Sequence, residues 1–376
     1  MTHIRTTHVG SMPRGEELTP LLLARDAGKS YDAEAFDRVV AKAVEDVVAL
    51  QKECGIDVVS DGELGKVGYS TYMIERLSGF GGHTDRRPAA DLAEVPGLAK
   101  KLSAIMGSQE FVRASCIGPV ELVTLQPLHD DIRRFRAALD RHGAGTQAFL
   151  NAASPGLITA FQVNRHYPDH ESYLAALVDA MREEYETIVE AGFLLQLDCP
   201  DLAMSRHTGY QDLDEAAFLK VAEANVEALN AATANIPPEK MRMHVCWGNY
   251  EGPHDHDIAL KKIVGTVLKA RPATILFEGA NPRHEHEWTV WRDISIPGDK
   301  VLAPGVIDTC SNYVEHPELI AQRIERFAGI VGADRVIAST DCGFGTFAGY
   351  GKIDPLVTRK KLMALREGAD LAGARL

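Results

Sequence analysis

Short apolar runs alternate with long amphipathic segments along most of this chain. In the amphipathic segments apolar residues recur three or four positions apart, as a helix with one buried face requires. Gly192 follows one such segment and Gly332 closes another, where glycine commonly ends a helix. The clearest predicted helices are Asp32–Cys54, Tyr173–Ala191, Asp214–Ala232 and Pro317–Gly332.

The apolar runs are predicted strands. Strands that alternate with helices pair in parallel through helical crossovers. No G-x-G-x-x-G fingerprint with its following acid indicates a Rossmann fold. We therefore expect an α/β fold, a (β/α)8 TIM barrel. The pattern gives nine runs for eight positions, so either the first or the fourth is expected to be irregular. The runs are Thr6–Val9, Asp57–Ser60, Arg113–Ile117, Leu157–Phe161, Leu194–Leu197, Met241–Val245, Thr274–Phe277, Val301–Ala303 and Val336–Ser339.

Residues 1–376 are expected to form a single domain, because barrels commonly reach this length. The alternation breaks at residues 81–112, which begin with Gly-Gly-His-Thr-Asp-Arg-Arg-Pro and predict an inserted loop or excursion. A second loop, 249–256, is rich in glycine, proline, histidine and aspartate.

The amino-acid composition limits the classes of partner that the protein is expected to bind. The chain is 45% hydrophobic and 25% charged, with a net charge of −13, which argues against non-specific nucleic-acid binding. No apolar run approaches the ~18 residues of a membrane span, and residues 1–5 lack a hydrophobic signal core. Six scattered cysteines indicate a reducing, cytoplasmic compartment. We expect small-molecule partners, with no nucleic acid and no membrane; a homo-oligomer is left open.

Three of the predicted strands end in residues that can bind a metal. His244 and Cys246 lie two positions apart, so in a strand their side chains share one face about 6.6 Å apart. Glu278 and Cys342 follow two other runs. Two thiolates and an imidazole favour Zn²⁺ over Mg²⁺ or Ca²⁺. A buried cysteine is also an ordinary core residue, so the pattern alone leaves metal binding and core packing open.

The order of several short motifs adds a resemblance that spans nearly the whole chain. The chain resembles the C-terminal catalytic barrel of cobalamin-independent methionine synthase, and its short single-barrel relatives such as epoxyalkane:coenzyme M transferase. The motifs are T-T-H-V-G-S-M-P-R (6–14), S-D-G-E (60–63), I-G-P-V (117–120), L-Q-L-D-C-P (195–200), H-V-C-W-G-N (244–249), F-E-G (277–279), A-P-G-V-I-D (303–308) and D-C-G-F (341–344).

The resemblance implies a zinc-dependent transferase that turns a thiol into a nucleophilic thiolate. It implies His244, Cys246, Glu278 and Cys342 as zinc ligands, although the segment from Cys246 to Glu278 looks longer than in methionine synthase. A metal lowers the pKa of a bound thiol. The resemblance also implies that substrate-binding residues hold the amino-acid end of a homocysteine-like thiol: Gly10 and Ser11 at its carboxylate, Glu63 and Asp198 at its ammonium.

Other polar residues near these motifs keep two interpretations. Arg14 can bind an anionic group of the substrate or be a solvated loop charge. Asp308 can be a catalytic acid or a structural anchor. Cys310 stands where methionine synthase has a histidine that serves proton transfer to the departing folate nitrogen. Four histidines in two loops can line a lid or bind a second metal: His254, His256, His284 and His286. Trp247 and Tyr250 can wall the pocket or pack in the core.

Three kinds of function fit these features. Methyl transfer to homocysteine or a similar thiol is favoured by Glu63 and Asp198, and places the chain in methionine biosynthesis. Opening of an epoxide by a coenzyme M-like thiol is favoured by the missing histidine, with Arg14, Lys66 and Arg165 as conceivable sulfonate ligands. A barrel with a structural zinc would need a closed four-ligand site. A metal-free decarboxylase would leave His244, Cys246 and Cys342 without a role. The thiol and the alkyl donor stay open.

Overall fold

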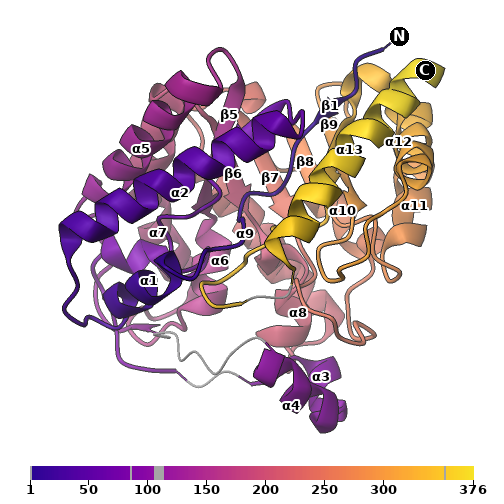
Figure 1. Ribbon diagram of the computed structural model, residues 1–376. Coiled ribbons are helices and arrows are strands. Elements are labelled where there is room, and N and C mark those ends of the chain that lie inside the picture. The colour runs from indigo at the N-terminus through magenta and orange to yellow at the C-terminus, as the bar shows by residue number, and fades with distance from the viewer. Residues whose placement is uncertain (1, 85–86, 106–113, 351–352) are drawn as a thin grey trace.

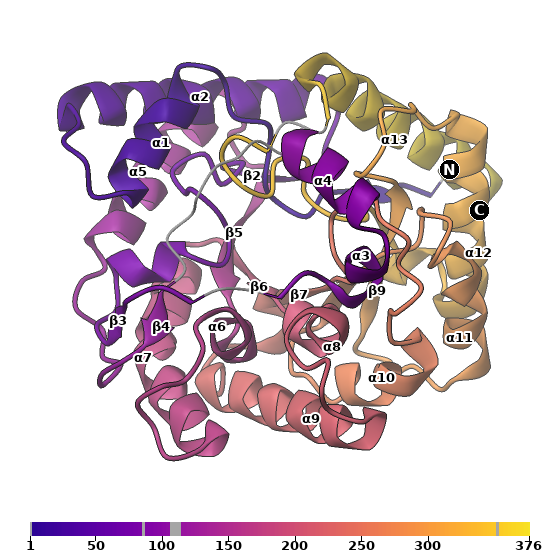
Figure 2. The same ribbon diagram turned by 90° about the horizontal axis from the view of Figure 1, so that it is seen from below.

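The computed structural model describes residues 2–84, 87–105, 114–350 and 353–376. Eight parallel strands form one curved sheet in the order β1-β10-β9-β8-β7-β6-β5-β2. Figure 2 looks into the barrel and shows helices in a ring around the strands. The (β/α)8 prediction is confirmed. The strands are β1 (Arg5–Thr6), β2 (Val58–Ser60), β5 (Gln147–Ala153), β6 (Leu194–Asp198), β7 (Met241–Val245), β8 (Thr274–Phe277), β9 (Val301–Ile307) and β10 (Ile337–Thr340).

The first two strands, β1 and β2, close the barrel. They stand at the two ends of the sheet order and form no regular ladder in the described residues. Asp57 N donates to Thr6 O at 3.2 Å, and Thr6 N donates to the Asp57 carboxylate at 2.8 Å. The Thr7 hydroxyl donates to Val58 O at 3.0 Å. Side chains therefore supply much of the closure.

The four predicted helices form within a few residues of the expected bounds. Aspartates at the start of three of them, Asp32, Asp169 and Asp214, accept a backbone N–H of the first turn, which satisfies a donor that the helix leaves unpaired. The described helices of the barrel and of its C-terminal end are α1 (Leu18–Asp26), α2 (Ala33–Glu53), α5 (Gln126–His142), α6 (Pro155–Phe161), α7 (His170–Glu190), α8 (Ser205–Thr208), α9 (Glu215–Ala232), α10 (Leu260–Val267), α11 (Trp288–Asp293), α12 (Pro317–Val331) and α13 (Pro355–Arg375).

Short 3₁₀ turns complete the connections, at η1 (Tyr72–Glu75), η2 (Pro200–Leu202), η3 (Pro238–Lys240), η4 (Glu285–Glu287) and η5 (Ala333–Arg335). Among the described residues, every helix falls short of the length or the apolar character that crossing a bilayer demands.

Two of the nine predicted strands are wrong as barrel strands. Leu157–Phe161 lies in helix α6, which begins after Ser154 accepts the Leu157 N–H and Pro155 takes the first position. The missing barrel strand is β5, whose sequence Gln-Ala-Phe-Leu-Asn-Ala-Ala has few strand-favouring residues. The Arg113–Ile117 run contributes β4 (Ser115–Cys116), which pairs antiparallel with β3 (Phe80–Gly81) outside the barrel; Arg113 lies outside the described residues.

The predicted excursion contains two helices in its described part, α3 (Ala90–Glu94) and α4 (Pro96–Ile105). In Figure 1 they protrude at the bottom of the molecule, opposite the end where both termini lie. The carboxylate of Asp91 in α3 accepts the Tyr250 hydroxyl at 2.8 Å and the His254 N–H at 2.9 Å. These bonds hold the excursion against the loop that follows β7. The single-domain assignment stays a prediction.

Candidate metal centre and substrate pocket

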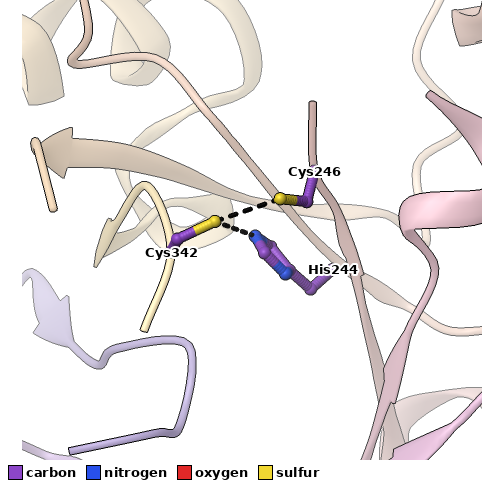
Figure 3. Close-up of side chains that lie close together, drawn as sticks. All are labelled: His244, Cys246 and Cys342. Carbon is purple, nitrogen blue, oxygen red and sulfur yellow. Dashed lines mark hydrogen bonds between the residues drawn. The ribbon is translucent and has the colours of Figure 1, made fainter. Parts of the chain in front are cut away.

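The three soft ligands predicted from the sequence meet at one end of the barrel. His244 belongs to β7, Cys246 follows it, and Cys342 follows β10. The two sulfur atoms lie 3.1 Å apart, and Cys342 Sγ lies 3.9 Å from His244 Nε2. Figure 3 shows the Cys342 thiol pointing toward both partners. The donor atoms of all three lie within 4.8 Å of one another and the side chains are buried, so the residues fit a soft metal ion.

The protonation of His244 also suits a ligand. Burial lowers its pKa to about 4, opposed by a hydrogen bond to the Asp341 carbonyl and helped by the charge of Arg242. The imidazole is therefore neutral at pH 7, which is the form that binds metals. Its Nε2 lies 2.9 Å from the Asp341 carbonyl oxygen.

Glu278 lies beside this cluster, in contact with Cys246, and both carboxylate oxygens also accept hydrogen bonds from other residues. It follows β8 and is buried. Oε1 accepts the Trp247 N–H at 2.7 Å, and Oε2 accepts the Asn281 side-chain amide at 2.7 Å. Burial raises the pKa of Glu278, and the positive charge of His284 opposes that shift. As a fourth ligand Glu278 stays a prediction.

Asp341, which sequence reasoning missed, anchors the ends of two strands. Its Oδ1 accepts the N–H groups of Gly279 and Ala280 at 2.8 and 2.9 Å, and its Oδ2 accepts the Asn281 N–H at 2.9 Å. A Cβ on Gly305 would stand 1.9 Å from Asp341 Oδ1, so only glycine fits there. Asp341 precedes Cys342, and it therefore ties a thiol ligand to the loop that carries Glu278.

A pair of buried carboxylates faces the same pocket. Asn151 Nδ2 lies 3.3 Å from both oxygens of Asp198, and Lys66 Nζ donates to the Asn151 carbonyl at 2.7 Å. Burial and the charge of Asp198 raise the pKa of Glu63 to about 8, and burial raises that of Asp198 to about 6. Glu63 Oε2 and Asn151 Oδ1 are buried acceptors without a hydrogen-bond donor among the described protein groups. The arrangement suits a bound ammonium group.

One cavity of about 50 Å³ joins the two groups of residues. Gly10 lies between two residues of the lining, Val9 and Ser11: its φ is +144°, and a Cβ there would stand 2.5 Å from Asn151 Oδ1 and 2.7 Å from Glu63 Oε1. Ser11 is buried, and its hydroxyl closely approaches Gly343. The lining comprises Val9, Ser11, Glu63, Tyr69, Asp198, Pro200, Met204, His244, Cys246, Asn249, Cys342, Gly343 and Thr346.

Four predicted site residues lie outside this lining: Gly10 and Glu278, described above, and Arg14 and Asp308. Arg14 donates to the carbonyls of Glu63, Lys66 and Gly345, and burial lowers its pKa to about 10. Asp308 accepts the Cys310 N–H at 2.9 Å and the Ser311 hydroxyl at 2.6 Å. Arg14 and Asp308 both hold loops at the mouth of the barrel. This favours the structural-anchor interpretation of Asp308, and it shows Arg14 bonded to backbone carbonyls where a solvated loop charge was the alternative to an anion ligand.

Of the predicted histidine pairs, His254 and His284 join a hydrogen-bonded cluster around Asp257, whereas His256 lies with Glu94 and Asp255 in an exposed group whose donor atoms are close enough to hold a metal ion. His254 Nδ1 and His284 Nε2 each lie 2.9 Å from Asp257 Oδ2, and His207 Nδ1 lies 3.1 Å from Asp257 Oδ1. Glu287 binds His284 from the other side at 2.8 Å. Burial lowers the pKa of His284, but these carboxylates raise it to about 10. No sequence spacing singles out His207 or Asp257.

The other two histidines lie apart from this cluster. His256 pairs with Glu94 on the surface, and His286 is exposed. Trp247 is fully buried, packs 4.3 Å from the ring of His284 and donates its indole N–H to Ile258 O, as core packing requires. Tyr250 is half-buried and stacks on His254.

Comparison with known proteins places this geometry in a family. A family model described as the catalytic domain of cobalamin-independent synthase matches residues 4–92 and 152–357. The chain belongs to the cobalamin-independent synthase family. Within this family it is 23% identical to methionine synthase of Saccharolobus solfataricus, over 99% of this chain and 95% of that protein.

Two further proteins are similar to this chain. The chain is 24% identical to 2-hydroxypropyl-CoM lyase of Xanthobacter autotrophicus, over 92% of this chain and 89% of that protein. Its fold is similar to that of a B12-independent methionine synthase from Shewanella sp. W3-18-1 in complex with selenomethionine, with a TM-score of 0.72 at 20% identity, covering 99% of this chain and 98% of that one.

Proposed function

We propose that this protein is a zinc-dependent thiol alkyltransferase that methylates a homocysteine-like amino thiol. The observation that carries the proposal is one buried pocket with two unlike ends: His244, Cys246 and Cys342 at one, and the Glu63–Asp198 pair at the other. Family membership supports a transferase of the methionine synthase kind.

The proposed zinc site has soft ligands with room for an exchangeable one. His244, Cys246 and Cys342 would hold the ion, and Glu278 stands beside them. Zinc bound there would lower the pKa of a substrate thiol so that it reacts as a thiolate at neutral pH. Two anionic sulfurs keep the site electron-rich, which favours a nucleophilic substrate sulfur.

This chain's own residues would orient the substrate. Glu63 and Asp198 provide carboxylates for an ammonium group. Asn151 Nδ2 contacts Asp198, and Lys66 donates to the Asn151 carbonyl. Gly10 and Ser11 are proposed at the substrate carboxylate, and a side chain at Gly10 would collide with Asn151 and Glu63, so the backbone next to the acidic pair requires glycine. Holding the sulfur at a fixed place relative to the alkyl donor supplies rate by positioning.

Opening of an epoxide by a thiol is the second candidate. It is supported by Cys310 at the place of the family's proton-transferring histidine and by the similarity to 2-hydroxypropyl-CoM lyase. The buried Glu63–Asp198 pair would repel the sulfonate of a coenzyme M-like thiol, and this observation ranks amino thiols first.

Zinc-edge X-ray absorption on the zinc-loaded protein tests the proposal. Homocysteine is expected to add a third sulfur to the zinc shell. Propanethiol, which has no charged groups, and coenzyme M are expected to do so only at concentrations on the order of tenfold higher or more. In the matched variant Glu63→Gln the advantage of homocysteine should shrink. Binding of coenzyme M in preference to homocysteine would select the epoxide reaction instead.

A further inference from the structure

The carboxylate of Glu278 occupies a built binding place next to the proposed metal ligands. Two donors hold it at 2.7 Å each: the Trp247 N–H on Oε1 and the Asn281 amide on Oε2. The first donor is backbone from the β7 loop, and the second is a side chain from the β8 loop. A buried carboxylate that accepts two such bonds is stabilised in that position by charge-assisted hydrogen bonding.

The orientation of the Asn281 side chain is fixed by its own neighbours. Its Oδ1 accepts the N–H groups of Arg283 and His284, both at 3.1 Å. Its Nδ2 therefore faces the acids, and donates to Glu278 at 2.7 Å and to Asp341 at 3.1 Å. A flipped amide would put its oxygen against two carboxylates and its NH₂ against two donors. The hydrogen bonds therefore allow only one orientation of the Asn281 amide.

Asn281 also links two of the proposed ligands. Asp341, which it contacts through both its N–H and its Nδ2, directly precedes Cys342. Glu278 lies three residues before Asn281. A single neutral amide thus separates two buried carboxylates that would otherwise repel each other, and it joins the end of β8 to the end of β10.

We propose that Asn281 is a positioning residue that fixes the orientation of the Glu278 carboxylate beside Cys246 and so determines which ligand gives way to substrate. The proposal rests on the zinc-dependent function proposed above. Glu278 is the hardest donor of the set, so it is the weakest bound to a soft site. The two hydrogen bonds give the released carboxylate a satisfied position, where an unpaired buried charge would be costly.

Two substitutions at Asn281 separate positioning from general structure. Asn281→Ser retains an oxygen that can accept from Arg283 and His284 but removes the amide donor. Asn281→Asp retains the size and the acceptor but places a third carboxylate against Glu278 and Asp341. The matched control is Asn225→Ser, which removes the amide that donates to another buried carboxylate, Asp201, at 3.0 Å.

The measurement is the homocysteine concentration at which zinc-edge X-ray absorption shows half of the gain in sulfur. Zinc content and circular dichroism are recorded on the same samples. We expect this concentration to rise on the order of tenfold in Asn281→Ser and further in Asn281→Asp, with zinc content unchanged. Asn225→Ser should leave it within about twofold of the wild type.

The outcomes distinguish the two proposals. A wild-type protein that binds no zinc, or gains no sulfur with any thiol, would overturn the proposed function. Normal thiol exchange in both zinc-loaded Asn281 variants would overturn the positioning role alone. If Asn281→Ser loses its fold, the isosteric Asn281→Asp decides the question, since an unchanged half-point there contradicts the inference.

Discussion

At the scale of single residues, the proposed metal site depends on three side chains that come from widely separated positions. His244 and Cys246 lie on one strand and its loop, and Cys342 follows another strand 96 positions after Cys246. All three side chains are buried at one pocket, and each can be changed by a single substitution. The contribution of each cysteine can therefore be measured by deletion.

We expect Cys246→Ser and Cys342→Ser each to lose most of the bound zinc while the barrel stays folded, because a hydroxyl is a poor ligand for a soft site. Elemental analysis against protein concentration, with circular dichroism, measures both properties. Cys54→Ser, which changes a buried thiol bonded to Arg359 O, is the matched control. Full zinc in either ligand variant contradicts the assignment.

Glu278→Gln should weaken zinc binding less than either cysteine change. Its carboxylate has two protein donors of its own, Trp247 N–H and Asn281 Nδ2, so less depends on the metal. Competition with a chelator of known affinity gives the order. If zinc affinity falls as much as in Cys342→Ser, Glu278 is not the exchangeable ligand.

The Glu63–Asp198 pair makes the free energy of unfolding depend on pH. Burial raises the pKa of Glu63 from 4.5 to about 8, so the folded protein holds this proton more tightly than the unfolded chain. The contribution to stability is complete below about pH 4.5 and is lost as pH rises through 8. We expect Glu63→Gln to flatten this fall in the free energy of unfolding between pH 5 and 8, as urea titration would reveal. An unchanged slope of the free energy of unfolding against pH in Glu63→Gln would contradict the raised pKa of Glu63.

The sequence predicts the three proposed metal ligands better than it predicts the hydrogen-bonded residues around them. His244, Cys246 and Cys342 were predictable because strand periodicity puts residues i and i+2 on one face, and parallel strand ends meet at one end of a barrel. Asn281 and Asp341 were not, since their roles depend on hydrogen bonds between loops whose relative position no local pattern encodes. The cluster around Asp257 was missed for the same reason.

At the scale of elements, the site depends on how closely β9 and β10 approach. Gly305 in β9 faces Asp341, whose Cα and backbone N would lie 2.7 and 2.8 Å from an added Cβ. The strand that sequence reasoning missed, β5, likewise contributes a side chain next to the pocket, Asn151, whose Nδ2 lies 3.3 Å from the Asp198 carboxylate. Its alanines and asparagine carry little strand propensity, and burial on both faces of the sheet decided its structure.

Gly305→Ala should therefore destabilise the protein by about 1–3 kcal/mol and weaken zinc binding, because the backbone at Asp341 must move and Cys342 moves with it. Denaturant unfolding and chelator competition measure the two effects. Gly265→Ala is the matched control, since its Cβ meets nothing within 4 Å in helix α10. It should be neutral or slightly stabilising. Equal behaviour of the two variants contradicts the argument.

At the scale of the whole molecule, the question is which alkyl donor reaches the pocket. Cys310 stands at the mouth, its sulfur 3.2 Å from Asn249 Oδ1, and Asn249 lines the cavity. A thiol with an ordinary pKa near 8.5 is a weaker acid than imidazolium near 6.5 at neutral pH. A thiol at this position is therefore a poor proton donor for a departing amine.

We expect poor turnover with methyltetrahydrofolate polyglutamate and homocysteine, and better turnover with a smaller or more reactive electrophile, such as an activated methyl group or an epoxide. Side-by-side assays with homocysteine and coenzyme M as acceptors provide the comparison. Cys310→His is the informative variant, because it should raise turnover with folate and leave that with the activated donor unchanged. Ordinary enzymatic rates of the wild type with folate would reverse this expectation.

The closure between β1 and β2 has a consequence for how the barrel opens. The other neighbouring strands of the sheet are joined by backbone ladders, whereas this junction relies on Asp57 and two threonines. The segments just beyond these strands carry Gly10, Ser11 and Glu63, so the least continuous part of the wall also bears the proposed binding residues for the amino acid. Cys342 follows β10, which pairs with β1 beside this junction, whereas Cys246 follows β7 across the barrel. Because few backbone hydrogen bonds hold the junction, we expect local opening there to displace the amino-acid end of the pocket and Cys342 before it displaces Cys246.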